Sequence, residues 1–243
     1  MQFNEAQIQA IQHNTGPCMV IAGPGSGKTT VLTHRVRYLI ERYGVKPSDI
    51  LVITFTKAAA EQMKLKFKGL SEGRNSAVTF GTFHAVFFTI IKAAYNYSAH
   101  CIIKPQIQHE FVKDQMCRLE LEYDDENEAV AGVLSEISCV KGEAVNIDEY
   151  ESRCIPPQSF RIMYRAYDDM LVRKHLIDFD DMIVQCRELL MQREDYRRAW
   201  QNKYKYILID EFQDINKAQF DVVRILADEY RNLFVVGDDD QSI

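Results

Sequence analysis

Five short runs of apolar and largely β-branched residues recur along the chain, separated by segments whose hydrophobic positions follow helical spacing. Short apolar runs of this kind predict strands that are buried on both faces of a parallel sheet. Helical patterns at residues 31–42 and 57–68 alternate with them, which predicts an α/β fold with helices on both faces of the sheet. The predicted strands are residues 18–22, 50–54, 77–81, 206–210 and 233–237.

Between residues 97 and 176 the pattern changes, because strand-like runs become rare and Glu, Tyr and Ala recur at helical spacing. An acidic segment at 120–128 and the Pro156-Pro157 pair interrupt this region. Strand-like runs resume only at residue 206. We therefore expect an α/β domain in two parts, 1–96 and 177–243, with a mostly helical domain inserted at 97–176.

Composition is that of a soluble globular protein, since 47% of the 243 residues are hydrophobic and 26% are charged. The first residues lack the basic and apolar regions of a secretion signal, so we expect a cytoplasmic protein. The most apolar stretch, residues 85–95, contains Lys92 and is too short to cross a bilayer, which predicts a buried helix and no membrane span. Six cysteines without C-x-x-C pairs or zinc-ligand spacing predict reduced thiols.

The formal net charge of −6 limits the ways in which the chain can bind nucleic acid. A protein that binds duplex DNA mainly by neutralising phosphates needs many Lys and Arg residues, and the charge argues against that mode. A narrow single-strand channel lined by aromatic rings stays compatible with it, because base stacking needs little net charge.

A glycine-rich loop follows the first predicted strand and precedes a helical pattern. Loops in this setting direct backbone N–H groups at phosphate oxygens, and the helix N-terminus adds the positive end of its dipole. Lys28 is predicted to reach the β- and γ-phosphates, and the Thr29 hydroxyl to ligate Mg²⁺. The alternative is a chance glycine turn, which the coincidence of strand, glycines, Lys-Thr pair and helix disfavours. The loop comprises Ala22, Gly23, Pro24, Gly25, Ser26, Gly27, Lys28 and Thr29, with Ala22 where the G-x-x-x-x-G-K-[ST] pattern has Gly.

An apolar strand that ends in two carboxylates, at residues 206–211, predicts the other half of a catalytic site. Asp210 is predicted to lie on the metal side, and Glu211 to act as the general base that activates water. A solvated acidic loop is the alternative for any single Asp-Glu pair. The phosphate loop upstream favours the catalytic interpretation, because ligands of open α/β sheets bind outside the carboxyl ends of the strands. The two motifs together predict a protein that binds a nucleoside triphosphate with Mg²⁺.

Six segments, at residues 3–7, 22–29, 54–59, 81–84, 210–214 and 237–243, span most of the chain. Their sequences and order resemble the N-terminal part of superfamily 1 DNA helicases of the UvrD/Rep/PcrA type. The resemblance implies a RecA-like ATP-binding domain with an inserted helical domain, in which the motif III strand lies between the phosphate-loop strand and the Asp-Glu strand. Residues 178–181 resemble the segment that returns from the inserted domain. The similar segments are the Q motif at 3–7, motif I at 22–29, motif Ia at 54–59, motif Ib at 81–84, motif II at 210–214 and motif III at 237–243.

The resemblance also implies roles for residues outside the phosphate loop. Gln7 of the Q motif recognises the adenine edge and makes ATP preferred over GTP. Gln213 and Gln241 approach the γ-phosphate, and Gln241 senses hydrolysis and links it to bound DNA. Family members commonly carry Arg after the Lys-Thr pair, whereas this chain has Thr30, so contacts to the base are expected to differ. ATP and Mg²⁺ are the expected cofactors.

Single-stranded DNA and duplex junctions are the partners that the resemblance implies, with the single strand crossing the top of the sheet. The contacting residues lie in the turns after other strands of the sheet. Phe55 has an alternative role as a core aromatic at a strand end, and His84 as a satisfied buried histidine. The DNA-binding candidates are Thr54, Phe55, Thr82, Phe83 and His84.

The function that we expect is the ATP-binding portion of a DNA helicase or translocase, moving three-prime to five-prime in repair or replication as the family implies. The family's second RecA-like domain, with an adenine-stacking aromatic and catalytic arginines, is not found after motif III. We therefore expect a monomer that binds ATP·Mg²⁺ weakly and hydrolyses it very slowly on its own. Two alternatives stay open. One is a stand-alone nucleotide-binding or regulatory module, and the other is a small phosphate-loop kinase, which has no need of the Gln7 segment.

Overall fold

The computed structural model describes residues 2–71 and 77–238, which belong to two compact units that are described separately. The first unit comprises Met1–Phe87, Leu189–Ile215 and Phe220–Ile243. The second unit comprises Phe88–Glu188 and Asn216–Gln219. The domain limits at 97 and 176 stay a prediction.

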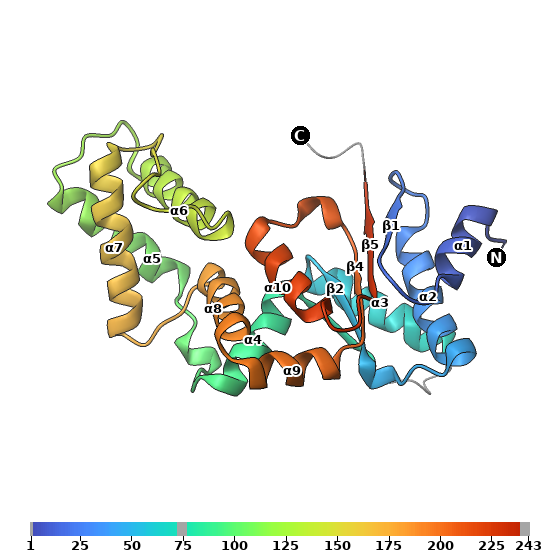
Figure 1. Ribbon diagram of the computed structural model, residues 1–243. Coiled ribbons are helices and arrows are strands. Elements are labelled where there is room, and N and C mark those ends of the chain that lie inside the picture. The colour runs from blue at the N-terminus through green and yellow to red at the C-terminus, as the bar shows by residue number, and fades with distance from the viewer. Residues whose placement is uncertain (1, 72–76, 239–243) are drawn as a thin grey trace. The chain divides into compact units, whose positions relative to one another are not determined.

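One parallel sheet, with five strands among the described residues, organises the first unit (Figure 1). Its order is β1-β5-β4-β2-β3, and every pairing is parallel. This arrangement confirms the predicted α/β sheet, with the last strand between the phosphate-loop strand and the Asp-Glu strand. The strands are β1 (Cys18–Ile21), β2 (Ile50–Thr54), β3 (Thr79–Thr82), β4 (Tyr206–Ile209) and β5 (Leu233–Gly237).

Helices cover both faces of this sheet. In Figure 1, α1 (Glu5–Gln12) and α2 (Lys28–Tyr43) lie on one side of the strands, and α10 (Lys217–Ala227) lies on the other. The helices of the first unit also include α3 (Lys57–Leu70), the start of α4 (Phe83–Ala94), the end of α8 (Phe179–Gln192) and α9 (Glu194–Lys203), with the short 3₁₀ helices η1 (Pro47–Asp49) and η3 (Phe212–Asp214).

Alternate side chains of the strands supply the cores on the two faces. Val52, Leu208 and Phe234 pack in one cluster with Leu32 and Val36 of α2. The side chains between them along the strands point to the opposite face, because successive residues of a strand alternate. These side chains are buried as well, which explains why the strands have near-continuous apolar sequences. They are Leu51, Ile53, Ile207, Ile209 and Val235.

The limits of three strands differ slightly from the sequence prediction. β1 ends at Ile21 and β4 ends at Ile209, each one residue earlier than predicted, so Ala22 and Asp210 lie in the connections beyond the strands. β3 begins two residues later and ends one residue later than predicted, because it pairs with β2 from Thr79 onward. With these limits, Thr82 is the last residue of β3, and Ala22 and Asp210 directly follow β1 and β4.

The prediction that each strand is buried on both faces is wrong for β1. Met19 and Ile21 are 60% and 62% exposed. β1 lies at one end of the strand order, where the helices on that face of the described sheet leave it uncovered. The apolar run at β1 therefore predicts the strand correctly but does not predict that both of its faces are buried.

Helix boundaries follow local signals. Asn4 caps α1 by accepting a hydrogen bond from the Gln7 backbone N–H at 2.8 Å, and Thr56 caps α3 by accepting one from Ala59. The helices predicted at 31–42 and 57–68 are present and longer than predicted. The apolar stretch predicted as a buried helix is α4.

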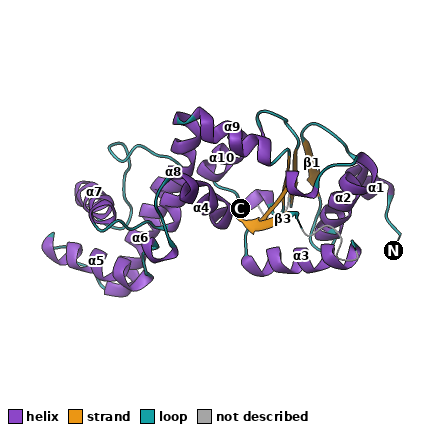
Figure 2. Ribbon diagram, turned by 90° about the horizontal axis from the view of Figure 1, so that it is seen from below, coloured by secondary structure: helices purple, strands orange, loops and turns teal. Residues whose placement is uncertain are grey.

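The second unit consists of helices and loops in its described residues, apart from one isolated bridge between Ile102 and Ile177 (Figure 2). Its core packs Val112 and Val133 against Phe160 and Tyr167. The helices that lie within this unit are α5 (Pro105–Arg118), α6 (Glu126–Gly142) and α7 (Pro157–Arg173), together with η2 (Ala99–Cys101) and most of α4 and α8.

A buried charge cluster joins α6, α7 and the start of α8 in this unit. The Nζ of Lys141 lies 3.0 Å from Asp178 Oδ2, 2.6 Å from Asp181 Oδ1 and 3.1 Å from Asp168 Oδ1. One ammonium group thus serves three carboxylates. Burial, followed by the charge of Asp178, raises the pKa of Asp181 to about 6, although Lys141 acts in the opposite direction.

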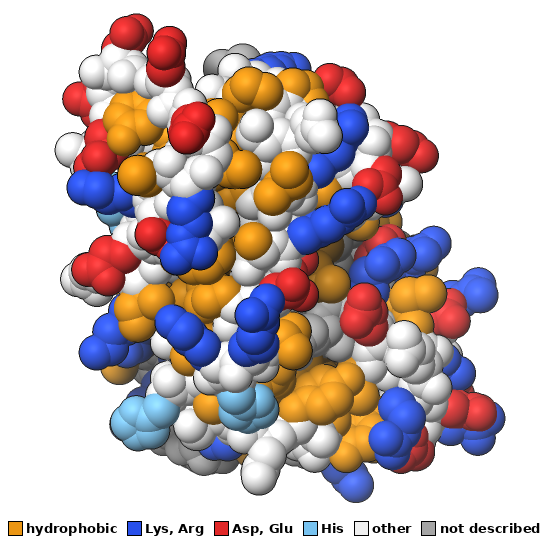
Figure 3. Space-filling model, turned by 90° about the vertical axis from the view of Figure 1, so that its left-hand side faces the viewer, with side chains coloured by type: hydrophobic (Ala, Val, Ile, Leu, Met, Phe, Trp, Pro, Cys, Tyr) orange, Lys and Arg blue, Asp and Glu red, His pale blue; other side chains and the backbone are white. Residues whose placement is uncertain are grey.

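Two observations describe the helices and one face of the surface. Among the described helices, none combines the length and the apolar character needed to cross a bilayer. On the face shown in Figure 3, Lys and Arg side chains lie among Asp, Glu and exposed hydrophobic side chains. On that face, basic side chains are therefore interspersed with acidic ones.

Candidate nucleotide-binding site

The phosphate loop is an open connection between β1 and α2. Gly25 and Gly27 have φ angles of 75° and 87°, in the left-handed region that favours glycine. The Gly27 carbonyl accepts hydrogen bonds from the N–H groups of Thr30 at 2.8 Å and Val31 at 3.0 Å, so α2 begins directly after it at Lys28. Residues 23–26 are exposed and leave the inside of the loop accessible.

Within α2 itself, no side chain of the described first turn neutralises the positive N-terminal end of the helix. Gly27 provides no side-chain cap, and the first turn of this described helix contains no acidic residue. Free N–H groups and the positive end of the helix dipole therefore face the loop. Together they form a site suited to the phosphates of a nucleotide.

Lys28 points toward the ends of two neighbouring strands. Its Nζ lies 3.3 Å from Glu211 Oε2, which follows β4, and 3.5 Å from Asp238 Oδ2, which follows β5. Sheet order explains the meeting, because β5 lies between β1 and β4. The structure thus brings together Lys28 and Glu211, which the sequence assigns to one site, and adds Asp238, which sequence analysis placed in motif III without giving it a role. Its position directly after an apolar strand was the available signal.

The two carboxylates after β4 have different surroundings. Asp210 is buried, and its backbone N–H donates to the Ile53 carbonyl at 3.0 Å. Burial, followed by the charge of Glu211, raises the pKa of Asp210 to about 6, while the backbone N–H of Glu211 and the charge of Lys28 oppose this. Glu211 has a φ of 54°, an uncommon conformation for a non-glycine residue, and its side chain is 39% exposed. A buried carboxylate beside an accessible one suits a metal ligand and a base.

The donor set fits Mg²⁺. The Thr29 hydroxyl and the Asp210 carboxylate are hard oxygen ligands, and Mg²⁺ in nucleotide sites usually takes one or two such groups together with phosphates and water. A cation would also favour the ionised form of Asp210, which burial and the charge of Glu211 disfavour and whose pKa they raise. Thr29 stands in the first turn of α2, where its carbonyl accepts a hydrogen bond from Thr33 Oγ1 at 3.0 Å.

Gln213 has both ends of its amide engaged by the protein. Its Nε2 donates to Glu211 Oε2 at 2.9 Å, and its Oε1 accepts from the Asp238 backbone N–H at 3.0 Å. These bonds connect the segment after β4 to the end of β5, and the contact with the γ-phosphate that the resemblance implies stays a prediction. Gln241, the other glutamine expected at the γ-phosphate, lies outside the described residues.

Gln7 connects the N-terminal helix to the phosphate loop. Its Nε2 donates to the Ser26 carbonyl at 3.0 Å, while its Oε1 accepts from the Asn4 backbone N–H at 3.0 Å in a capping box. Buried Arg35 of α2 holds the other end of α1, since its guanidinium donates to the carbonyls of Ala10 and His13. The bond to Ser26 places the Q-motif glutamine beside the phosphate loop.

Thr30 contacts a lysine that sequence analysis missed. Lys66 of α3 donates from its Nζ to Thr30 Oγ1 at 2.7 Å. The two residues are 36 positions apart, and Lys66 is one of several lysines on an exposed helix face, so no local pattern distinguishes it. The ammonium of Lys66 therefore lies beside Thr30, the position at which family members commonly carry Arg.

The DNA-binding candidates divide into buried and accessible residues. Thr54 is buried and donates from Oγ1 to the Thr56 carbonyl at 3.0 Å. Phe83 is 1% exposed, and its ring centroid lies 5.3 Å from that of half-buried Phe55. Thr82 and His84 are half-buried, and burial lowers the pKa of His84. Their contact with DNA stays a prediction, and Phe83 is in a position to support Phe55.

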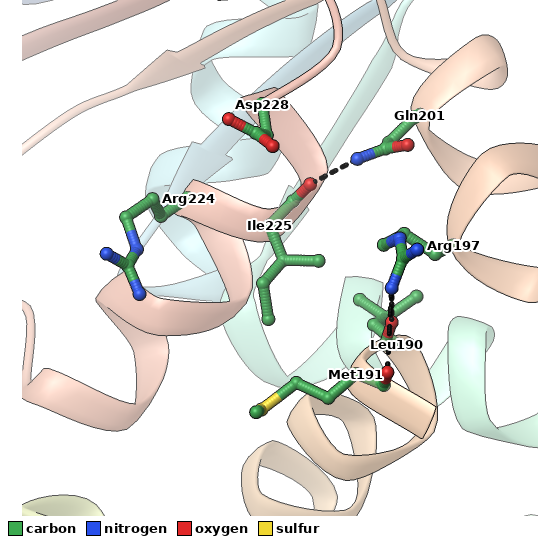
Figure 4. A pocket seen from close by; sticks show the side chains of 7 residues that line it. All are labelled: Leu190, Met191, Arg197, Gln201, Arg224, Ile225 and Asp228. Carbon is green, nitrogen blue, oxygen red and sulfur yellow. Dashed lines mark hydrogen bonds between the residues drawn. The ribbon is translucent and has the colours of Figure 1, made fainter. Parts of the chain in front are cut away.

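A separate pocket of about 460 Å³ lies between the end of α8, α9 and α10 (Figure 4). Two of its polar side chains have partners within the protein: Arg197 donates to the carbonyls of Leu190 and Met191, and Gln201 donates to that of Ile225 at 2.7 Å. The pocket includes Asp228, which precedes β5, whereas the phosphate loop follows the end of a strand. The nucleotide site is therefore a different place.

An open phosphate loop after one strand, with a lysine, a hydroxyl and an Asp-Glu pair at the end of a neighbouring parallel strand, defines a RecA-like phosphate-loop protein. The chain belongs to the UvrD/REP helicase N-terminal domain family, whose model matches residues 3–243.

Similar proteins with curated names support the same family. The chain is 36% identical over 251 residues to the ATP-dependent DNA helicase Rep of Escherichia coli, a match that covers 100% of this chain and 37% of Rep. It is 35% identical over 247 residues to the ATP-dependent DNA helicase PcrA of Staphylococcus epidermidis, covering 99% of this chain and 34% of that protein. For PcrA of Staphylococcus aureus the identity is 32% over 250 residues, with 99% and 34% covered. The chain thus spans about a third of the length of these relatives.

Proposed function

We propose that this chain is the ATP-binding N-terminal portion of an ATP-dependent DNA helicase or translocase that moves on single-stranded DNA. The proposal rests on one observation: Lys28 Nζ lies 3.3 Å from Glu211 Oε2. The two groups meet at the carboxyl end of the sheet, where Asp210 follows β4 and Thr29 lies in the first turn of α2. Movement from three-prime to five-prime and a role in repair or replication follow from the family alone.

The residues of the site divide the work of phosphoryl transfer. N–H groups of the loop and Lys28 bind and orient the phosphates, and Thr29 and Asp210 hold Mg²⁺. Bound Mg²⁺ neutralises charge on the phosphate oxygens. Glu211 orients the attacking water and accepts its proton, and its partial exposure lets water reach it. Gln7 recognises the adenine edge.

DNA is proposed to contact the accessible candidates at the ends of β2 and β3. Phe55 supplies an aromatic face for base stacking, and Phe83 beneath it keeps that ring in place. Thr82 and His84 supply polar groups for the phosphate backbone. Stacking contacts of this kind need little net charge, in agreement with the acidic chain.

Turnover by this chain alone is proposed to be slow. Among the described residues, contacts place two cations near the phosphate loop: Lys28 at the end of the loop and Lys66 beside Thr30 in the first turn of α2. Related phosphoryl-transfer enzymes gain about 10³ to 10⁵ in rate from an arginine supplied from outside the loop. We propose that a second RecA-like domain supplies such an arginine in the complete helicase.

The experiment is nucleotide binding to the whole 243-residue chain, followed by thermal unfolding with and without ATP·Mg²⁺. ATP should raise the unfolding temperature of the wild type. Lys28→Ala should keep a cooperative unfolding transition but abolish this shift, because the change removes the ammonium that binds the phosphates. Lys46→Ala, an exposed lysine of the same unit, is the control. A shift that survived Lys28→Ala would contradict the site, and strong DNA-stimulated hydrolysis would contradict the slow turnover.

A further inference from the structure

A closed ring of polar contacts joins the phosphate-loop lysine to the ends of two strands. Lys28 Nζ lies 3.3 Å from Glu211 Oε2 and 3.5 Å from Asp238 Oδ2. Gln213 closes the ring, since it donates to Glu211 Oε2 at 2.9 Å and accepts from the Asp238 backbone N–H at 3.0 Å. The ring therefore connects the loop after β1 with the ends of β4 and β5.

The ring is closely packed. The Lys28 side chain is 10% exposed and that of Asp238 is 1% exposed. A Cβ on Gly237 would lie 3.1 Å from Gln213 Oε1, so this close approach needs glycine at the end of β5. The ammonium of Lys28 is thus held by carboxylates in an enclosed place where water competes weakly.

The same ammonium is the group that the proposed function assigns to the β- and γ-phosphates. Carboxylate and phosphate oxygens compete for the donors of one lysine. The Lys28 ammonium can donate all of its hydrogen bonds to a bound nucleotide only when it gives up its contacts with Glu211 and Asp238. The hydrogen bond from Gln213 to Glu211 does not involve the lysine, so this exchange leaves it in place.

We propose that Asp238 and Gln213 are positioning residues, which hold Lys28 and Glu211 together before nucleotide arrives, so that binding transfers the lysine from carboxylates to phosphate oxygens. This inference rests on the proposed function and adds the residues that regulate the site. Asp238 competes with the nucleotide and lowers its affinity. Gln213 continues to orient Glu211 after the transfer.

The test measures the affinity of the whole chain for ATP·Mg²⁺ by calorimetry after Asp238→Asn. Removing the competing charge should tighten binding about tenfold, which corresponds to about 1.4 kcal/mol. Asp221→Asn is the control, because it makes the same charge change on α10, where Asp221 Oδ1 lies 3.7 Å from Arg224 Nη2. Its affinity for ATP·Mg²⁺ should stay within about twofold of the wild-type value. Unchanged or weaker binding by Asp238→Asn would overturn the proposal.

A double-mutant cycle separates competition for Lys28 from simple repulsion of the phosphates. Glu211→Gln should also tighten binding, because Glu211 holds the same ammonium. Since either carboxylate holds part of Lys28 when the other is gone, the double variant should tighten binding about threefold beyond the product of the single factors. Simple repulsion would give the product alone, and that result would also overturn the proposal.

Two further outcomes keep the test decisive. If Asp238→Asn fails to fold, Glu211→Gln decides, because its side chain is 39% exposed and the change is compatible with folding. An unchanged affinity in that variant would then contradict competition for Lys28. If the wild type binds no ATP, the proposed function fails, and this failure is distinct from that of the ring.

Discussion

Replacing Lys141 by Met should destabilise the second unit strongly, because it removes a buried ammonium group that lies beside three carboxylates. Lys141 lies within 3.1 Å of carboxylate oxygens of Asp168, Asp178 and Asp181. The cluster carries a formal charge of one positive and three negative groups, and the substitution leaves three negative groups with Asp178 buried. Breaking a buried ion pair from one side costs about 3–5 kcal/mol.

The loss should depend on pH. The three carboxylates raise the pKa of Lys141 despite its burial, whereas the pKa of Asp181 is also raised, to about 6, because one ammonium serves several carboxylates. A carboxyl group whose pKa is about 6 folded and about 3.9 unfolded favours folding below the lower value and loses this effect as pH rises through the upper one. Without Lys141 the ionised form is disfavoured further. The variant should therefore lose about 4 kcal/mol near pH 8 and about half of that near pH 5.

Urea unfolding followed by circular dichroism at both pH values measures this loss, and hydrogen exchange of α6 and α8 locates it. Lys113→Met is the matched control, since Lys113 lies 2.6 Å from Glu126 Oε1 at the surface of the same unit. Its removal should have little effect on stability at either pH. Equal losses for the two variants, or an Lys141→Met loss that does not change with pH, would refute the reasoning.

Two further predictions concern the nucleotide site. Because the pKa of Asp210 is raised to about 6, protonation should weaken Mg²⁺-dependent ATP binding about tenfold for each pH unit below that value. Asp210→Asn should abolish this pH dependence in calorimetry, and a dependence that persisted would exclude Asp210 as the metal ligand. Gln7→Ala should reduce the preference for ATP over GTP by about tenfold, the size of one lost hydrogen bond at the base. Gln9→Ala on the same helix is the control, and an unchanged preference would exclude Gln7 from base recognition.

Local sequence patterns predicted the strands well, because the physical cause of each run is local. A strand of a parallel sheet is buried by helices on two faces, so its residues are apolar whatever their partners. The same reasoning was wrong about Met19 and Ile21, which are exposed. Their side chains satisfy the strand pattern, whereas their burial depends on which elements cover the end of the sheet. Apolar character therefore predicts conformation more securely than it predicts environment.

The phosphate loop and the Asp-Glu pair were predictable for a similar reason. The loop needs glycines for its backbone conformation and Lys28 and Thr29 for its chemistry, and all of them are consecutive in sequence. Gln213 was also recognised as a residue of the site. Its bond with the Asp238 backbone was not predictable, because it depends on the register of two neighbouring strands, whereas its bond to Glu211 is local. A motif thus identifies residue types while the fold assigns their partners.

The contacts that sequence analysis missed all cross between elements that are distant in sequence. Lys66 reaches Thr30 across 36 positions, and Gln213 reaches Asp238 across 25. Hydrophobic periodicity carries no information about such pairs, because it reports only which face of an element is buried. The order β1-β5-β4 creates the second of these contacts by placing the end of β5 between the phosphate loop and the Asp-Glu pair, whereas the first joins α3 to α2. A small displacement of β5 would therefore change the surroundings of Lys28 and Glu211 together, and for this reason substitutions in the ring are expected to be coupled.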